Sequence, residues 1–235
     1  MNPLYVISAS VPAGNRVRQF HNDDPGSARY LLMEPPHFRY GGFDLRTLDI
    51  PHLGPDDCWE VRSGERKVLR LYQDGTLIFR AAADESFLGW GMEHAAFLEY
   101  PRINPVPVVE VHASFAHLYA RVLDQLHKPP TDILFRLMLR GAVWTNKRLF
   151  LTEYYDVPIW QVGDPPQYVV HSDPASETLT ILPAQLREAP NQVAYELVAA
   201  FASLFEMPSD KIPFVREVGG VREIDINQIV KLRAA

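Results

Sequence analysis

Four residues in the first third of the chain have the types and spacing that metal-assisted hydrolysis uses. Asp56 and Asp57 follow a proline, and Glu65 and Lys67 open a segment of mixed apolar and polar residues. Carboxylates can hold a divalent cation, and a lysine beside them can act on the attacking water. Because residues two apart on a strand share a face, Glu65 and Lys67 are expected on one side of a strand.

This arrangement predicts one candidate activity, that of a metal-dependent nuclease of the PD-(D/E)xK type, with Asp56, Asp57, Glu65 and Lys67 as its catalytic residues. The alternative is a solvated turn, since acidic residues next to glycine are common in loops. The interval from Asp56 to Glu65 is also short for such a site. We therefore favour a chain without catalytic activity and keep the nuclease as the alternative.

Histidine and cysteine do not suggest a metal centre. His112 and His117 lie five residues apart in an expected helix, which places them about 140° apart around its axis. His52 and Cys58 are near each other, but Cys58 is the only cysteine, which excludes a zinc ribbon and a disulfide framework. We expect the histidines at the surface or at the boundary of the core, with no bound metal.

Nucleophilic and phosphate-binding motifs are also missing from the sequence. His171, Ser172 and Asp173 are consecutive, so their side chains diverge on an extended chain. The sequence contains no Gly-x-Ser-x-Gly elbow, no Gly-x-Gly-x-x-Gly motif and no Walker A motif. We therefore expect no cofactor.

Aromatic and basic residues suggest a recognition surface instead. One group lies on the polar stripe of an expected helix, and the other combines arginine with tyrosine. Such side chains can bind a partner protein or nucleic acid through charge and stacking. The alternative is a solvated helix face and an arginine that covers an apolar neighbour. The candidate binding residues are Arg39, Tyr40, Arg70, Tyr72, His117 and Arg121.

The composition of the chain limits the classes of protein to which it can belong. The chain has 235 residues, of which 47% are apolar, which suffices for one large domain or two small ones. The net charge of −6 is spread evenly, since residues 1–105 and residues 106–235 each carry −3. The sequence thus shows no cluster of basic residues of the kind that binds nucleic acid, although a basic patch can form on folding. No signal peptide and no apolar run of ~20 residues is present, so we expect a cytoplasmic protein without a membrane span.

The strongest local prediction is a β-hairpin at residues 67–80. The Asp-Gly pair at positions 74–75 favours a two-residue type I′ turn. That turn pairs Leu71 with Ile78, and both faces of the hairpin are then at least half apolar. The pattern predicts a sheet that is covered on both sides.

Periodicity places the other elements along the chain. Apolar residues at helical spacing predict two amphipathic helices, at about residues 108–127 and 191–205, and a short helix is expected near residues 93–97. Strands are predicted at residues 4–7, 30–34, 58–62, 133–140, 149–155, 168–171 and 178–182. We predict an α+β fold with a mostly antiparallel sheet, two principal amphipathic helices and a loop-rich N-terminal third. Residues 1–235 are expected as a single domain, the alternatives being an extended arm at residues 1–60 and a subdivision near residue 105.

A family resemblance appears between residue 39 and residue 229. It rests on the aromatic helix with Tyr195, Phe201 and Phe205, on the Ser209–Phe214 link and on an isoleucine-rich end. The segments 39–43, 72–75 and 103–105 add to it. This part resembles the region that follows Schlafen-type AlbA_2 DNA-binding domains in bacterial proteins. The AlbA_2 domain itself, with its Glu-x-x-x-x-Glu-Phe-Lys-like signature, is missing, so no catalytic residues transfer.

The resemblance implies an accessory module of bacterial defence or mobile-element systems. Together with the residues described above, it leads us to expect a cytoplasmic, non-catalytic module that binds a partner protein or nucleic acid. A homo-oligomer is a further alternative that the sequence leaves open.

Overall fold

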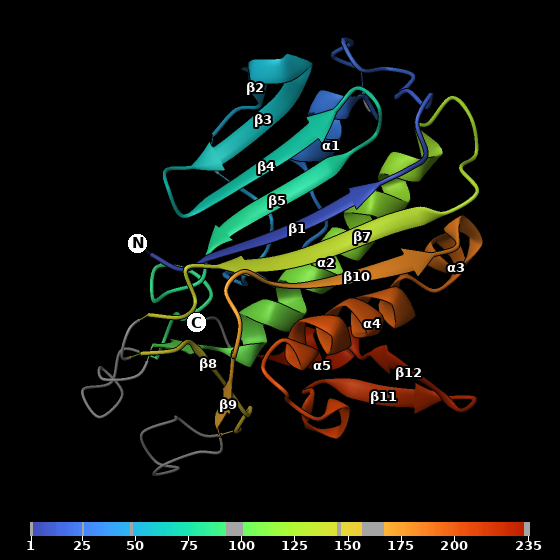
Figure 1. Cartoon of the computed structure of the whole chain (residues 1–235). Helices are drawn as coiled ribbons and strands as arrows, with labels where there is room; N and C mark the ends of the chain where they lie inside the picture. The colour runs from blue at the N-terminus through green and yellow to red at the C-terminus, as the bar shows by residue number, and fades with distance from the viewer. Residues whose placement is uncertain are drawn as a thin grey trace.

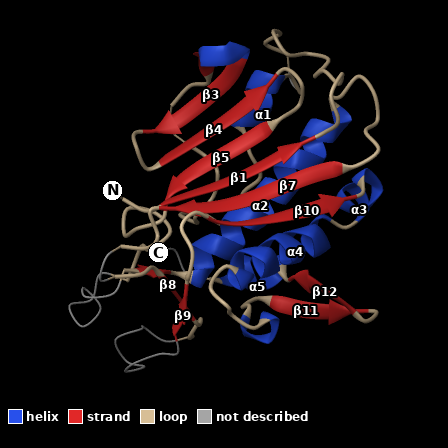
Figure 2. Ribbon diagram, viewed as in Figure 1, coloured by secondary structure: helices blue, strands red, loops and turns tan. Residues whose placement is uncertain are grey.

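The computed structural model describes residues 2–24, 26–47, 49–92, 101–144, 147–156 and 167–232. Within them, seven strands form one antiparallel sheet in the order β10-β7-β1-β5-β4-β3-β2 (Figures 1 and 2). These strands are β1 (Leu4–Ser10), β2 (His52–Gly54), β3 (Cys58–Ser63), β4 (Lys67–Tyr72), β5 (Leu77–Ala82), β7 (Ile133–Arg140) and β10 (Ala175–Ile181).

Helices and two smaller sheets complete the described part of the chain. The helices are α1 (Ala28–Met33), α2 (Pro105–Asp124), α3 (Pro183–Glu188), α4 (Pro190–Ser203) and α5 (Ile226–Lys231), with short 3-10 turns η1 (Pro55–Asp57) and η4 (Ser209–Lys211). One small sheet contains β6 (Arg102–Ile103), β8 (Phe150–Thr152) and β9 (Gln167–Val169). The other is a hairpin of β11 (Val215–Val218) and β12 (Val221–Ile224).

Helix α2 is the main element that covers the sheet. Its start is defined by Asn104, whose side chain accepts a hydrogen bond from the Val106 N–H (3.0 Å), and by Pro105 in the first turn. Fifteen of its twenty residues are buried, including the polar Glu110 and Ser114. The helix therefore packs on more than one side, against the sheet and against α4 (Figure 1).

An aromatic cluster joins the sheet to these two helices. Tyr5 of β1 and Phe201 of α4 have ring centroids 5.0 Å apart, and Phe135 of β7 and Tyr119 of α2 have centroids 5.7 Å apart. All four side chains are fully buried. Large aromatic rings in such contact contribute strongly to a core, so β1, β7, α2 and α4 form its centre.

The structure confirms the predicted α+β class, the mostly antiparallel sheet and the two principal helices, which are α2 and α4. The strands predicted at residues 4–7, 58–62 and 133–140 are confirmed as β1, β3 and β7. The strand predicted at residues 30–34 is wrong, because the Ser27 hydroxyl accepts a hydrogen bond from the Tyr30 N–H and begins helix α1. The short helix expected near residues 93–97 lies outside the described residues.

The hairpin of β4 and β5 differs from the prediction in its register. Leu71 pairs with Leu77 and not with Ile78, because the turn has three residues instead of two. Gly75 occupies the left-handed position of this turn, with a φ of 88°. A shift of one residue moves every side chain of β5 to the opposite face of the sheet.

This register decides which face of the sheet is covered. The buried side chains of β4 and β5 now lie together on one face, namely Leu69, Leu71, Leu77 and Phe79. Figures 1 and 2 show α1 and α2 behind this face. The expectation of a sheet covered on both sides is therefore wrong for the described residues, since the helices that pack on the sheet lie on one face of it.

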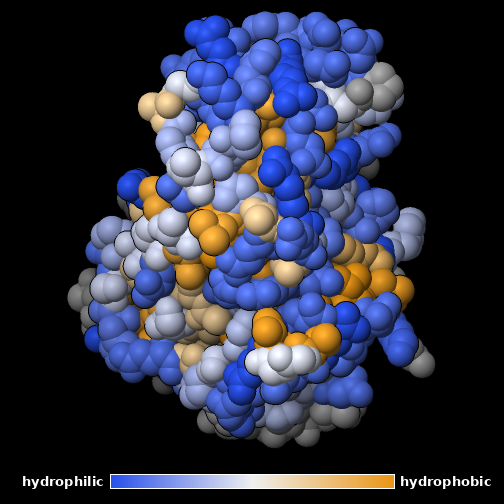
Figure 3. Space-filling model, turned by 90° about the vertical axis from the view of Figure 1, so that its right-hand side faces the viewer, coloured by the Kyte–Doolittle hydropathy of each residue, from blue (hydrophilic) through white to orange (hydrophobic). Residues whose placement is uncertain are grey.

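The buried apolar residues form one cluster that extends from Tyr5 to Ile229. Residues 1–60, considered above as an arm, include β1, which lies between β5 and β7 in the sheet. On the side of the molecule drawn in Figure 3, hydrophobic residues form small groups separated by hydrophilic side chains. Among the described residues, no helix is long and apolar enough to cross a lipid bilayer. The domain organisation stays a prediction.

Candidate functional site

The face of the main sheet opposite α1 and α2 is called the open face here. Its side chains alternate with core residues along each strand, and all of them except Cys58 and Glu60 are at least partly exposed. The open face consists of the outward side chains of His52, Cys58, Glu60, Arg62, Val68, Arg70, Tyr72, Ile78, Arg80, Ala82, Leu4, Val6, Ser8, Ser10, Leu134, Arg136, Met138, Arg140, Ser176, Thr178 and Thr180.

The charged side chains of the open face are mostly basic. Five arginines and one glutamate give its strand residues a net charge of +4, whereas the whole chain carries −6. The five arginines come from four strands and are Arg62, Arg70, Arg80, Arg136 and Arg140. Folding therefore separates positive from negative charge and creates a local positive potential that the sequence does not show.

The pairing of the strands sets these side chains in rows. One row across the sheet contains, in order, Thr178, Arg136, Ser8, Ile78, Arg70 and Glu60. Three strand spacings separate Arg136 from Arg70, which places their Cα atoms about 14 Å apart. Hydroxyl groups thus lie beside guanidinium groups in one line across the sheet.

Glu60 is the carboxylate of this set and is fully buried between two arginines. Arg70 Nε donates to Glu60 Oε2 (2.5 Å), and Arg62 Nε donates to Oε1 (2.7 Å). Burial raises the pKa of Glu60, but the hydrogen bonds from Arg70 and Arg62 outweigh that effect and hold the pKa below its ordinary value. Glu60 therefore orients these two arginines and compensates one of their charges.

The other three arginines are more available to a ligand. Arg80, Arg136 and Arg140 are exposed and form no ion pair with a carboxylate among the described residues. Arg140 Nε lies 3.3 Å from Sδ of Met138 on the same strand, and the rest of its N–H donors remain for a ligand. A guanidinium group can donate two parallel hydrogen bonds to a phosphate or a carboxylate.

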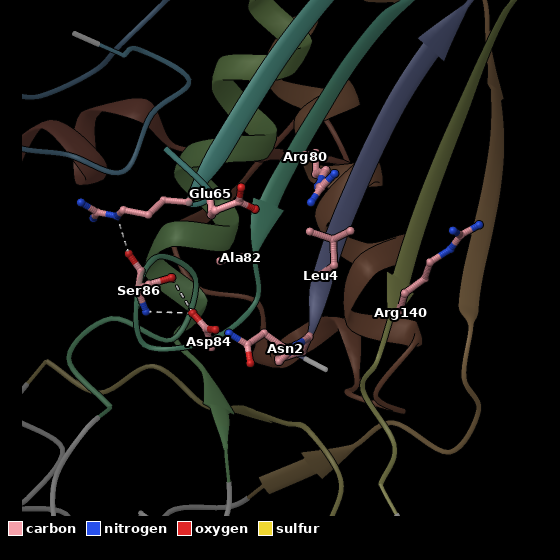
Figure 4. Close-up of a pocket in the computed structure, with 10 residues that line it drawn as sticks. Asn2, Leu4, Glu65, Arg80, Ala82, Asp84, Ser86 and Arg140 are labelled. Atoms are coloured by element: carbon pink, nitrogen blue, oxygen red, sulfur yellow. Dashed lines mark hydrogen bonds between the residues drawn. The ribbon is translucent and has the colours of Figure 1, made fainter. Parts of the chain in front are cut away.

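A pocket of about 520 Å³ lies at the end of the open face, near the N-terminus (Figure 4). In Figure 4 the side chain of Leu4 lies between those of Arg80 and Arg140. Glu65, from the turn after β3, and Asp84 also line the pocket. The lining of the pocket thus combines the apolar Leu4 with the arginines Arg80 and Arg140 and the acidic residues Glu65 and Asp84.

The predicted binding residues do not form one surface. Arg70 and Tyr72 lie on the open face as part of β4. Arg39 is buried on the helix side of the sheet, with its Nε 2.6 Å from Oε1 of Glu110 in α2. Tyr40, its neighbour in sequence, is 91% exposed. The predicted aromatic and basic cluster is therefore divided between the two sides of the sheet.

His117 and Arg121 of α2 also lie on the helix side. His117 Nε2 is 2.8 Å from Oδ1 of Asn191 in α4, and Arg121 donates to the carbonyl of Glu34 (2.6 Å), directly after α1. These contacts connect α2 to its two neighbouring helices. Of the six predicted binding residues, only the two from β4 belong to the open face.

The structure does not bring the four residues of the nuclease alternative together. Asp56 and Asp57 lie in η1 before β3, and Glu65 lies in the turn after β3. The six residues of β3 separate these ends by about 17 Å. Lys67 points to the helix side, because it pairs with the buried Ala81. Within the described ranges, no group of three or more His, Cys, Asp or Glu side chains could hold a metal ion.

Sequence reasoning missed Arg80, Arg136 and Arg140. A signal for two of them was present, because Arg136 and Arg140 interrupt the apolar residues of a strand at positions four apart and must share a face. Arg80 could not be found, since the expected hairpin register placed it on the same face as the buried Leu69.

Comparison of the chain with family models, with curated proteins and with solved structures finds no match. The resemblance to the region that follows AlbA_2 domains therefore stays a prediction.

Proposed function

We propose that this protein binds single-stranded nucleic acid on its open face and acts as a non-catalytic module. The observation that supports this most is the set of three exposed arginines, Arg80, Arg136 and Arg140, which have no carboxylate partner among the described residues. Guanidinium groups of this kind bind phosphate oxygens through charge-assisted hydrogen bonds. The net charge of +4 favours the approach of a polyanion.

The uncharged side chains of the open face suit the other parts of a nucleotide. Ser8 and Thr178 flank Arg136 in one row and can donate to phosphate or sugar oxygens. Tyr72 offers an aromatic ring, and Val6 offers an apolar surface, to bases that are not paired. A single strand presents its bases to such a surface, whereas a duplex keeps them stacked inside.

An acidic partner protein is the alternative. Apolar residues such as Val68, Ile78 and Leu134 lie between the arginines of the open face, and protein interfaces combine arginine with apolar contacts. We favour nucleic acid because the apolar residues alternate with guanidinium and hydroxyl groups along the rows. A protein interface usually gathers its apolar residues at one centre with a polar rim.

Fluorescence anisotropy with short labelled RNA and DNA strands tests this proposal. The triple variant Arg80→Gln, Arg136→Gln, Arg140→Gln removes three charges and leaves polar side chains on the surface. We expect its affinity to fall by roughly 10-fold or more, since one charge-assisted hydrogen bond contributes about 1.5 kcal/mol or more.

Arg187→Gln is the matched control. Arg187 is a partly exposed arginine of α3 that pairs with Asp124 on the helix side, so its replacement is expected to leave the affinity unchanged. Equal binding by the triple variant and the wild type would overturn the proposal. Binding of an acidic polypeptide with no binding of RNA or DNA would also overturn it, in favour of a protein partner.

Three broader expectations of the sequence also remain proposals. An accessory role in bacterial defence or mobile-element systems rests on the family resemblance alone. A cytoplasmic location rests on the sequence, and a homo-oligomer is an alternative that the sequence leaves open. Identification of the proteins and nucleic acids that co-purify with the chain tests the first. Light scattering on the purified protein tests the oligomeric state.

A further inference from the structure

A second pocket, of about 510 Å³, lies on the helix side of the turn between β3 and β4. The loop of residues 41–47 forms one wall, Lys67 lies at the start of β4, and Phe87 and Trp90 come from the segment after β5. We call it the Lys67 pocket. Its lining is distinct from that of the pocket on the open face, except that Arg66 lines both.

Two cations of the Lys67 pocket are bonded to neutral groups. Lys67 Nζ donates to the carbonyl of Asp44 (3.0 Å), and Arg66 Nε donates to the carbonyl of Ser86 (2.9 Å). A third cation, Arg46, is neutralised by the Asp44 carboxylate, which accepts from its Nε and lies 2.7 Å from its Nη2. These groups therefore leave a net charge of +2 around the pocket.

Aromatic rings line the other part of the Lys67 pocket. The ring centroids of Phe43 and Trp90 lie 5.4 Å apart, and Lys67 Nζ lies 5.3 Å from the centroid of Phe87. Trp90 is 39% exposed, although a ring of this size is usually well covered. An aromatic surface beside two cations suits a planar ring that is joined to an anionic group.

The loop that forms the wall is held by Glu110 of α2. The Glu110 carboxylate accepts hydrogen bonds from the Phe43 N–H and from Arg39 Nε. Gly42 lies against the same carboxylate, so closely that a Cβ there would be 2.7 Å from Oε2. The wall is therefore pre-organised, and a ligand does not have to order it on binding.

We propose that the Lys67 pocket binds a nucleoside 5′-monophosphate, with its phosphate at Lys67 and Arg66 and its base against Trp90. The two uncompensated cations match a phosphate monoester, which carries about −1.5 to −2 charges at neutral pH. The volume of the pocket lies in the range of small-molecule sites. This site goes beyond the nucleic-acid surface, because it lies on the other side of the sheet.

Isothermal titration calorimetry of the full chain with AMP tests the proposal. Trp90→Ala is expected to weaken AMP binding by about 5-fold or more, the lower end of the loss of one stacked base. Lys67→Gln is expected to weaken it by about 10-fold or more, because a charge-assisted hydrogen bond to phosphate is lost. Ribose 5-phosphate and adenosine, which each lack one part of the ligand, are expected to bind more weakly than AMP.

Two control variants separate this site from the open face. Arg187→Gln and Arg136→Gln are both expected to keep the affinity for AMP, since neither residue lines the pocket. A wild-type protein that does not bind AMP would overturn the proposal, and so would equal affinities of Trp90→Ala and wild type. Ribose 5-phosphate that binds as tightly as AMP would contradict the contact with the base.

The variants also distinguish a failure to fold from a loss of binding, and they test the two binding sites separately. Trp90 is partly exposed, so its replacement by alanine is expected to leave the fold intact. Trp90→Ala therefore tests the site even if circular dichroism shows that Lys67→Gln does not fold. Loss of RNA binding in Arg136→Gln with unchanged AMP binding supports two separate sites. A wild-type protein that binds AMP but neither RNA nor DNA would overturn the open-face proposal alone.

Discussion

The hydroxyl of Tyr5 lies 2.6 Å from Nε2 of His112, and this buried hydrogen bond joins the interior strand β1 to helix α2. The other ring nitrogen, Nδ1, lies 2.6 Å from the carbonyl of Val108. A carbonyl only accepts, so Nδ1 carries the proton and Nε2 accepts from Tyr5. Burial lowers the pKa of His112 to about 4, so the neutral imidazole is part of the core.

We expect the protein to lose stability in acid through His112. An unfolded histidine takes a proton near pH 6.5, whereas folding lowers the pKa of His112 to about 4. Its contribution to the free energy of unfolding is therefore complete above pH 6.5. It falls by about 1.4 kcal/mol per pH unit as the pH drops toward 4.

Urea unfolding at a series of pH values measures this slope. His112→Gln is expected to flatten it, and His127→Gln, at an exposed position, is expected to preserve it. Equal slopes in the wild type and His112→Gln would contradict the assignment.

Arg39→Met tests the buried ion pair with Glu110. Both side chains are almost fully buried, and loss of the cation is expected to cost about 3–5 kcal/mol at neutral pH. Burial already raises the pKa of Glu110, and Arg39 partly offsets this, so the variant raises that pKa further.

The sign of the pH dependence follows from that shift. A carboxyl group with a raised pKa favours the folded state in acid and loses this contribution as the pH rises through the folded pKa. The stability deficit of Arg39→Met is therefore expected to be smaller near pH 4 than at pH 7. Chemical denaturation at both pH values checks this, and a constant deficit would speak against it.

Gly75→Ala tests the observed turn between β4 and β5. Gly75 has a φ of 88°, and a Cβ there would lie 2.7 Å from Cδ2 of the buried Leu126. Gly64 also has a positive φ, of 53°, but nothing lies within 4 Å of its Cβ position. We expect Gly64→Ala to cost about 1 kcal/mol from backbone strain alone. Gly75→Ala is expected to lower the free energy of unfolding by more than Gly64→Ala does, as measured by thermal unfolding. Equal losses in the two variants would show that contact with Leu126 adds nothing to the cost of backbone strain.

The salt dependence of RNA binding counts the phosphate contacts of the open face. For single strands, the logarithm of the affinity falls with that of the salt concentration by about 0.7 per neutralised phosphate. Replacing Arg80, Arg136 and Arg140 by glutamine is therefore expected to make the slope about 2 units less steep. Anisotropy titrations at several NaCl concentrations measure it. A weaker affinity with an unchanged slope would mean that these arginines do not contact phosphates.

AMP binding is expected to weaken in alkaline solution. Burial lowers the pKa of Lys67 to about 8, while the charge of Asp44 raises it in part and Arg66 and Arg46 lower it. The ammonium group that holds the phosphate is therefore lost as the pH rises through about 8. Lys67→Arg keeps its charge throughout this range. Calorimetry should show a falling affinity in the wild type and a constant one in Lys67→Arg, and parallel behaviour would contradict the role of Lys67.

Most elements could be predicted because their signals are local. Apolar residues at helical spacing indicated α2 and α4, and alternation in residues 133–140 indicated β7. Helix α1 was missed because its short apolar run also suits a strand, and the Ser27 cap decides between them. The candidate site could be predicted only in part from the sequence, since Arg70 and Tyr72 were identified but Arg80, Arg136 and Arg140 on the same face were not.

The sequence by itself determined the α+β class and the identity of most strands and helices, because propensity and periodicity act over neighbouring residues. Only the tertiary structure decided which side chains share a surface. Arg80 and Arg136 share the open face because β1 pairs with both β5 and β7, and the three-residue hairpin turn sets the face of β5. Arg39 leaves the predicted cluster because Glu110, 71 residues away, is its buried partner. Contacts between distant segments depend on burying the whole core, which no local pattern specifies.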